Sequence, residues 1–380
     1  MIALFLLLFF FYIPKQQDAK RNAVSHQDIA ISQATLNFHQ SFFIADLHAD
    51  SLLWDRNLKY KHTHGHVDLP RLLEGNIGLQ VFSVVTKSPK NQNLFSNTDK
   101  TDNITLLIIA QRWPIKTWAS LYQRAIYQSE KLHALQKESE AKFFIIRSKK
   151  DFSDYLKTRT ANADISAGLL SLEGAHALEG KLENVESLFN AGYRIIGFTH
   201  FFDNQLGGSA HGIKKGGITE FGLQVLQRME ELGILVDISH SSPALVNDIV
   251  KHSTRPLIAT HTGVKKICGD SPRNLSDEQI KQIANSNGVI GIGFWPNATC
   301  SDDIVGIIDS IQHVIDLVGE DYVALGSDFD GSVQTPFDSA NINQLTHALL
   351  TQGFSEAQIK KIMGGNVKRL LLEHLPEENF

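Results

Sequence analysis

The strongest constraint in this chain is a set of apolar runs that each end on a side chain able to bind metal. FIADLHAD carries His48 and Asp50, LLSLEGAH carries Glu173, ILVDISH ends on His240 and PLIATH ends on His261. Parallel strands present their carboxyl ends to one edge of a sheet, so these side chains are expected to meet there. The pattern predicts a metal site at the rim of a barrel and is typical of a metallohydrolase.

The order of apolar and amphipathic segments predicts an α/β fold, a (β/α)8 TIM-like barrel. Amphipathic stretches with helix signals separate most of the expected strands, and a regular repeat of this number is typical of such a barrel. The barrel is expected to span 41–375, with a helical insertion at 86–166 between strands 2 and 3. That insertion is either a wall of the site or plain surface structure. The expected strands are 43–48, 78–85, 167–173, 193–199, 234–239, 256–260, 288–294 and 321–327.

Composition agrees with one large enzyme domain and excludes several classes of function. With 380 residues and 42% hydrophobic content, the chain can bury the core of a barrel. Its net charge of −5 and the lack of a long basic run exclude nucleic acid as a partner. Two cysteines, Cys268 and Cys300, are too few for a zinc finger, so any metal must use N and O ligands. The two are expected either to form a disulfide or to stay as thiols.

The N-terminal end is expected to lie outside the barrel. Residues 1–14 contain an apolar run too short to span a bilayer, which predicts a signal peptide or an uncleaved membrane anchor. Residues 15–40 are polar without strong periodicity and are expected to be a linker. The protein is therefore expected to be exported, and to be periplasmic, extracellular or anchored to a membrane.

Each candidate ligand also has a plain structural explanation. His48 and Asp50 are two apart on a strand and point the same way, but the same cluster can cap a helix. Glu173 after so apolar a run is costly unless it binds metal or pairs with a cation. His240 and His261 follow consecutive strands, although a single histidine there is more often a hydrogen-bonded core residue. Their joint occurrence favours the metal site.

A further carboxylate, Asp328 in GSDFDG, ends the eighth expected strand. A carboxylate at this place can accept a proton from an activated water. DFDG is only a fragment of a calcium-binding loop, and the bidentate Glu is not in place, so an EF-hand is excluded.

From about 43 to 371 the chain resembles the membrane dipeptidase (renal dipeptidase) family, an amidohydrolase-like group of metal-dependent barrels. The resemblance rests on an ordered set of motifs, and many other such barrels begin with His-x-His where this chain has His48-x-Asp50. The motifs are DLHAD, HVDLPRLLEGNIGLQVFS, SLEGAH, GFTHFFDN, GILVDISHSS, ATHTGV, PRNLSDEQI, GSDFDG and MGGNVKRLL.

The resemblance implies a site for two zinc ions per chain with a hydroxide between them. It places one ion on His48 and Asp50, the other on His240 and His261, and Glu173 between both. For the reaction it implies three further residues: His200 stabilises the oxyanion, Arg273 holds the terminal carboxylate of the substrate and Asp328 moves the proton. It also suggests a homodimer.

The resulting hypothesis is a zinc-dependent dipeptidase acting on dipeptides with a free C-terminal carboxylate. One alternative is another metal-dependent amidohydrolase, acting on N-acyl amino acids or lactams. Another is a non-catalytic binding protein that kept the barrel.

Overall fold

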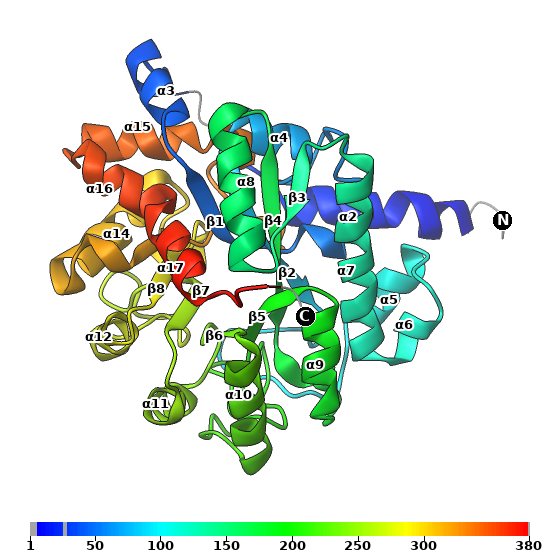
Figure 1. Ribbon diagram of the computed structural model, residues 1–380. Helices are drawn as coiled ribbons and strands as arrows, with labels where there is room; N and C mark the ends of the chain where they lie inside the picture. The colour runs from blue at the N-terminus through cyan, green and yellow to red at the C-terminus, as the bar shows by residue number, and fades with distance from the viewer. Residues whose placement is uncertain (1–5, 26–28, 379–380) are drawn as a thin grey trace.

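The computed structural model describes residues 6–25 and 29–378 and shows a closed parallel barrel with helices around it (Figure 1). Eight strands follow one another around the barrel, and β2 pairs with β4 to close it. All residues of these eight strands are buried, as expected when helices cover the outside and side chains fill the inside. The predicted fold is confirmed. The strands are β1 Ile44–Ala49, β2 Ile77–Val85, β4 Ser166–Glu173, β5 Tyr193–Gly197, β6 Leu235–Asp237, β7 Leu257–Thr262, β8 Val289–Ile292 and β9 Val323–Leu325.

Most of the helices begin at a residue that caps them. Ser276 and Gln279 form the capping box expected from the sequence, and Gly233 ends α10 with a φ of 76°. The helices are α2 Ile13–Arg21, α3 Gln33–Gln40, α4 Leu69–Glu74, α5 Ile104–Ala110, α6 Lys116–Ala119, α7 Leu121–Glu138, α8 Lys149–Ala161, α9 Glu183–Asn190, α10 Glu220–Leu232, α11 Pro243–His252, α12 Asp277–Asn285, α13 Pro296–Thr299, α14 Ile304–Val318, α15 Asn343–Thr351, α16 Glu356–Lys360 and α17 Asn366–His374. Short 3-10 or π-helical turns are η1 Leu8–Tyr12, η2 Ser51–Leu53, η3 Ala175–Leu178, η4 Glu320–Tyr322, η5 Ser339–Asn341 and η6 Lys361–Gly365.

The insertion between the second and third barrel strands holds α5, α6, α7 and α8. It also contains a short strand, β3 Phe143–Ile145, in the apolar run FFIIR. This strand pairs in parallel with the first residues of β4, on the edge that β5 occupies further along. The insertion is therefore hydrogen-bonded to the barrel sheet through β3 and is not only a surface segment.

Three strands that lead to site residues end earlier than the sequence predicted. β5 ends at Gly197, β6 at Asp237 and β9 at Leu325, each two residues before the expected end. His240 and Asp328 then have φ values of 63° and 60°, which are uncommon for residues other than glycine. A residue with a left-handed backbone conformation cannot continue a strand. The side chains of His240 and Asp328 are therefore positioned by turns that follow the strands.

The segment expected to be a linker is folded where the structure describes it. Residues 13–21 form α2, and residues 33–40 form α3 with Thr35 and His39 buried. Asp18 in α2 is only 2% exposed, because it pairs with the buried guanidinium of Arg56. Polar composition concealed this packing, since the burial relies on an ion pair and not on an apolar face. Residues 1–5 of the expected signal or anchor and 26–28 of the expected linker lie outside the described residues.

A disulfide joins two neighbouring loops at the carboxyl end of the barrel. Cys268 follows β7 and Cys300 follows β8, and their Cα atoms are 5.2 Å apart. Of the two states left open by the sequence, the structure has the bonded one.

Candidate metal centre

The five predicted ligands converge at the carboxyl end of the barrel. His48 lies in β1 with Asp50 just after it, and Glu173 is the last residue of β4. His240 follows β6, and His261 lies near the end of β7. All five are at most 4% exposed. Residues up to 213 positions apart in the sequence thus meet in one buried cluster.

Glu173 is the centre of this cluster. Its Oε1 lies 2.9 Å from Nε2 of His240, 3.3 Å from Nε2 of His261 and 3.7 Å from Nε2 of His48. Nε2 of His48 is also 3.6 Å from Oδ1 of Asp50. One carboxylate therefore faces three imidazoles, and a second carboxylate lies beside the third of them.

Three groups in this cluster have the spacing of metal ligands, and they share members. His48, Glu173 and His261 form one, and His48 and Asp50 form another with Asp328. The third joins Glu173 and His240 with His200. The predicted catalytic residues His200 and Asp328 thus lie as close to the centre as the predicted ligands do.

The charges of the cluster are balanced poorly by the protein alone. Among the described residues, Asp50, Glu173 and Asp328 form no ion pair with a lysine or an arginine. Burial, and then the charge of Asp50, raise the pKa of Glu173 well above its ordinary value. Burial also raises the pKa of Asp328 to about 7. Three carboxylates so placed favour a bound cation.

The histidines divide into one imidazole that favours a positive charge and three that do not. Burial opposes a charge on His48, but Asp50, Glu173 and Asp328 outweigh it and raise the pKa of His48 to about 10. Burial lowers the pKa of His200, His240 and His261 well below the ordinary value. Neutral imidazole is the form that binds metal.

Thr260, a residue that the sequence did not single out, sets the orientation of two imidazoles. Its hydroxyl donates to Oδ2 of Asp237 at 2.7 Å, because a carboxylate can only accept. The same oxygen lies 3.1 Å from Nδ1 of His48 and 3.1 Å from Nδ1 of His261, so both ring N–H groups donate to it. Each ring then turns Nε2 toward the cluster, as the second layer of a metal site does. In the sequence, Thr260 could have been noticed as a polar residue inside the apolar run PLIATH.

The donor set fits divalent metal ions. Nε2 of His48 and Oδ1 of Asp50 are buried without a hydrogen-bond partner, which is costly unless a cation takes that place. The described residues of the cluster offer imidazole nitrogen and carboxylate oxygen, and both cysteines are held in the disulfide. Such a set suits zinc, manganese or cobalt.

The remaining predicted residues flank the cluster. Nε2 of His200 is 3.4 Å from Oε2 of Glu173, and Oδ1 of Asp328 is 4.0 Å from Nε2 of His48. Arg273 is 8% exposed, donates to the carbonyl of His261 at 2.6 Å, and lies with its guanidinium carbon 5.0 Å from the ring centre of Trp295. The predicted oxyanion donor, proton carrier and carboxylate anchor thus surround one space.

A cavity of about 950 Å³ contains this cluster and extends to the surface. Its inner wall includes Glu173, His240, His261 and Arg273. Its outer wall includes residues of the N-terminal helix α2, which the sequence placed outside the fold.

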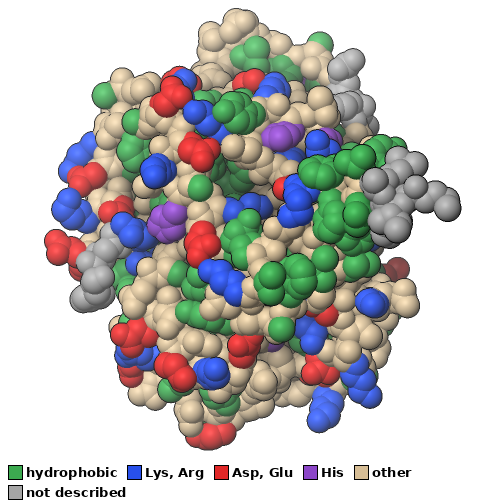
Figure 2. Space-filling model, turned by 90° about the vertical axis from the view of Figure 1, so that its right-hand side faces the viewer, with side chains coloured by type: hydrophobic (Ala, Val, Ile, Leu, Met, Phe, Trp, Pro, Cys, Tyr) green, Lys and Arg blue, Asp and Glu red, His purple; other side chains and the backbone are tan. Residues whose placement is uncertain are grey.

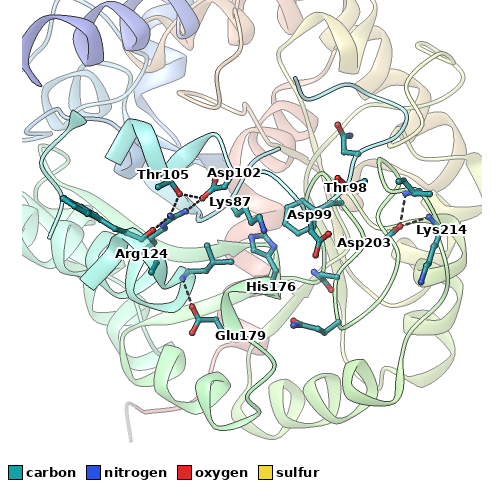
Figure 3. A pocket seen from close by; sticks show the side chains of 18 residues that line it. Lys87, Thr98, Asp99, Asp102, Thr105, Arg124, His176, Glu179, Asp203 and Lys214 are labelled. Atoms are coloured by element: carbon teal, nitrogen blue, oxygen red, sulfur yellow. Dashed lines mark hydrogen bonds and ion pairs between the residues drawn. The ribbon is translucent and has the colours of Figure 1, made fainter. Parts of the chain in front are cut away.

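A second cavity, of about 830 Å³, lies next to it and holds no predicted site residue (Figure 3). Its charged side chains are largely used to hold the protein together. Asp102 accepts from the buried Arg124, Glu179 accepts from the first amide of α7, and Asp203 accepts from the amide of Lys214. The charged side chains of this lining therefore stabilise the fold, unlike those of the metal cluster.

The barrel and its cluster of buried carboxylates and imidazoles define a metal-dependent hydrolase. A profile of the family described as membrane dipeptidase, peptidase family M19, matches residues 32–376. The chain belongs to this family, and the expected class of enzyme, a metal-dependent dipeptidase, is confirmed.

Curated relatives and solved structures agree. The chain is 25% identical over 365 residues to dipeptidase aclJ of Aspergillus oryzae, covering 87% of this chain and 78% of that protein. It is 29% identical over 329 residues to dipeptidase tcpJ of Claviceps purpurea, covering 84% and 72%. A metallo peptidase of Rhodobacter sphaeroides, solved with a phosphinate mimic of the dipeptide L-Ala-D-Ala, has the same fold. Its TM-score is 0.69 at 22% identity, covering 88% of this chain and 99% of that one.

Proposed function

We propose that this protein is a zinc dipeptidase that holds two ions per chain and cleaves the amide bond of dipeptides with a free C-terminal carboxylate. The observation that carries the proposal is the convergence of three buried carboxylates and four imidazoles beside one buried arginine. A structural cluster would pair its carboxylates with cations, whereas this one leaves buried ligand atoms without partners.

In the proposed site, His48 and Asp50 hold one ion, His240 and His261 hold the other, and Glu173 contacts both. If these residues hold two divalent ions, the ions would lower the pKa of a water molecule toward neutrality and polarise the scissile carbonyl. The position of Glu173 supports this division, since its Oε1 faces imidazoles of both sets.

The protein's own groups supply the remaining steps. Asp328, whose pKa is raised by burial to about 7, takes the proton from the attacking water and passes it to the leaving amine. His200 is assigned the hydrogen bond to the oxyanion, since its Nε2 faces the cluster 3.4 Å from Oε2 of Glu173. Arg273 binds the C-terminal carboxylate of the substrate.

We also propose that a D-residue is accepted at the second position of the dipeptide. The solved relative from Rhodobacter sphaeroides carries a phosphinate mimic of L-Ala-D-Ala. A carboxylate anchor such as Arg273 fixes the end of the substrate and leaves the stereochemistry of the last residue to the shape of the pocket.

The test is elemental analysis of the purified protein together with a panel of L,L and L,D dipeptides, with and without a chelator. The proposal expects two zinc ions per chain and cleavage that the chelator abolishes. If none of the dipeptides is cleaved in a chelator-sensitive way, the proposal is overturned. Cleavage of N-acyl amino acids or lactams alone would point to another amidohydrolase, and binding without turnover to a non-catalytic protein.

The anchor is tested by Arg273→Gln on matched substrates. A charged hydrogen bond contributes about 1.5–3 kcal/mol, so kcat/KM for a free dipeptide is expected to fall about 10- to 100-fold. Cleavage of the same dipeptide with an amidated C-terminus should be unchanged, and an equal fall for both substrates would reject the assignment.

We further propose that the protein is exported and associates with a membrane through its N-terminal segment, and that it forms a homodimer. Six large hydrophobic side chains of this segment are between 42% and 58% exposed, and Figure 2 shows the hydrophobic surface at this end of the molecule; they are Leu6, Leu7, Leu8, Phe11, Tyr12 and Ile13. Within residues 6–25 and 29–378, no helix has the length and apolar character needed to cross a bilayer. Cell fractionation and light scattering test these points. Recovery in the cytoplasm, or a monomer, would reject the corresponding one.

A further inference from the structure

The N-terminal helix α2 forms part of the wall of the catalytic cavity. Ile13, Pro14, Gln17 and Arg21 of α2 line the same cavity as the metal cluster, together with Phe9 of the preceding η1. Figure 1 shows α2 lying along one side of the barrel. Residues that precede the first barrel strand therefore contribute to the space into which a substrate must fit.

An ion pair inside the protein fixes α2 in this position. Nε of Arg56 donates to Oδ2 of Asp18 at 2.8 Å, and the same guanidinium lies 2.8 Å from Oδ1 of Asp330. Asp18 and Arg56 are 2% and 5% exposed. Breaking a buried pair of this kind leaves an uncompensated charge, so the helix is held firmly.

Backbone contacts continue this attachment after the helix ends. The side chain of Asn22 accepts from the amide of Ser332 at 2.9 Å. The amide of Ser25 donates to the carbonyl of Thr335 at 2.9 Å, and the amide of Thr335 donates to Ala23. The segment 332–335 follows Asp328 closely, so the N-terminal segment is attached to the same loop that carries a catalytic residue.

The outer wall of the cavity carries positive charge. Arg21 and Lys90 line it, and both are exposed. The guanidinium of Arg21 donates to Gln17 at 3.2 Å, and within the described part of the chain neither Arg21 nor Lys90 forms an ion pair with a carboxylate. The acidic residues of the cavity lie elsewhere: three belong to the metal cluster, and Asp330 pairs with Arg56.

We propose that Arg21 and Lys90 make the enzyme prefer dipeptides that carry an acidic side chain, and that Asp18 positions Arg21 for this role. The inference rests on the proposed dipeptidase activity and names a substrate class for it. Two unpaired cations at a cavity mouth attract an anionic side chain both on approach and when bound. Each exposed charge pair is expected to raise kcat/KM about two- to fivefold.

The experiment compares dipeptides that differ only in charge, Ala-Glu with Ala-Gln and Glu-Ala with Gln-Ala. The full chain is expected to cleave the glutamate member of at least one pair about 3- to 20-fold more efficiently. High salt should reduce this ratio, because exposed charges are screened. A ratio near one for both pairs in the unmodified protein would overturn the proposal.

The variant that tests the residues is Arg21→Gln combined with Lys90→Gln. It should bring the ratio close to one while kcat/KM for the glutamine peptides and the metal content stay unchanged. Lys20→Gln is the matched control, since it removes the same charge from the exposed neighbouring position outside the cavity lining, and its ratio should stay as it was. An unchanged ratio in the double variant would reject the assignment.

Asp18→Asn tests the positioning role. It should lower the glutamate preference, leave cleavage of the glutamine peptides in place, and expose α2 to limited proteolysis. If α2 becomes exposed in this variant but the glutamate preference is preserved, Asp18 has no positioning role. If the glutamine peptides are cleaved but the ratio of glutamate to glutamine cleavage differs from these expectations, the proposed acidic preference is wrong and the proposed dipeptidase activity is unaffected. If no dipeptide is cleaved, the proposed function falls with it.

Discussion

The two cavities at the carboxyl end of the barrel are similar in size and both contain many charged side chains, yet they differ in how these charges are satisfied. In the cavity of about 830 Å³, Arg124 and Asp102 pair with each other, and backbone amides occupy Glu179 and Asp203. In the cavity of about 950 Å³, Oδ1 of Asp50 has no hydrogen-bond partner, and neither has Nε2 of His48, which lies 3.6 Å from it. The smaller cavity has a single ring nitrogen of this kind, Nδ1 of His176. A group of unsatisfied buried ligand atoms that includes a carboxylate, and not polarity or volume, therefore distinguishes the metal centre from the second cavity.

The sharpest test of this difference is Glu173→Gln, which removes one charge at the centre without changing its shape. Because bound metal typically contributes several kcal/mol to catalysis in such sites, kcat/KM should fall by more than about 10³-fold and the metal content should drop. Elemental analysis and dipeptide kinetics measure both. Glu179→Gln in the second cavity is the control and should keep metal and activity. Equal losses in the two variants would show that the two cavities do not differ in function.

His200→Ala distinguishes a catalytic role from a ligand role within the same cluster. Loss of one oxyanion donor typically lowers kcat about 10²- to 10³-fold, and the metal content should stay intact. The comparison matters because His200 also has the spacing of a ligand with Glu173 and His240. Loss of metal along with activity would make His200 a ligand. His176→Ala, on the wall of the second cavity, should leave the kcat of the folded protein unchanged.

Arg124→Gln tests whether the charged residues of the second cavity have a structural role. Arg124 is buried and donates to Asp102 and to backbone carbonyls, so its loss should lower the free energy of unfolding by about 3–5 kcal/mol. Urea unfolding measures this. Arg228→Gln, which breaks an exposed pair with Glu186, should cost less than about 1 kcal/mol. A change in metal content on Arg124→Gln, with little change in stability, would contradict the structural role.

Thr260→Val tests how the imidazoles of His48 and His261 are oriented. The variant keeps the shape but removes the oxygen that accepts from His48 and His261, so metal affinity should fall about 10- to 100-fold. Titration with a competing chelator measures the affinity, and excess metal should restore turnover. Thr262→Val is the control on the same strand, because the Thr262 hydroxyl contacts only backbone carbonyls. Unchanged affinity in Thr260→Val would show that other contacts orient the rings.

The stability of the chelated protein is also expected to depend on pH. The pKa of His48 is about 10 in the folded state against about 6.5 in an unfolded chain, so the stability it contributes is complete below about pH 6.5 and is lost toward pH 10. The free energy of unfolding should therefore fall by about 2.5 kcal/mol between pH 7 and 9. The metal-loaded protein should show a smaller fall, because the ion replaces the proton. Equal slopes would argue against metal at Nε2 of His48.

The barrel and the convergence of the candidate ligands were predictable because they depend on patterns local to each strand. Apolar runs ending on His48, Glu173 and His261 mark both the strands and the rim, since parallel strands bring their ends together whatever the loops contain. Strand ends at β6 and β9 were not predictable, because the turns at His240 and Asp328 use a backbone conformation without a glycine to announce it.

The sequence by itself determined the kind of fold, the family and the side chains that can bind metal. Tertiary structure decided how these groups are tuned: Thr260 orients two imidazoles, and Arg56 binds Asp18 and so draws α2 into the cavity wall. The physical reason lies in the range of the interactions. Periodicity and strand ends can be seen within a few residues, whereas a buried hydrogen bond or ion pair depends on partners that only the folded chain brings within 3 Å or so of one another.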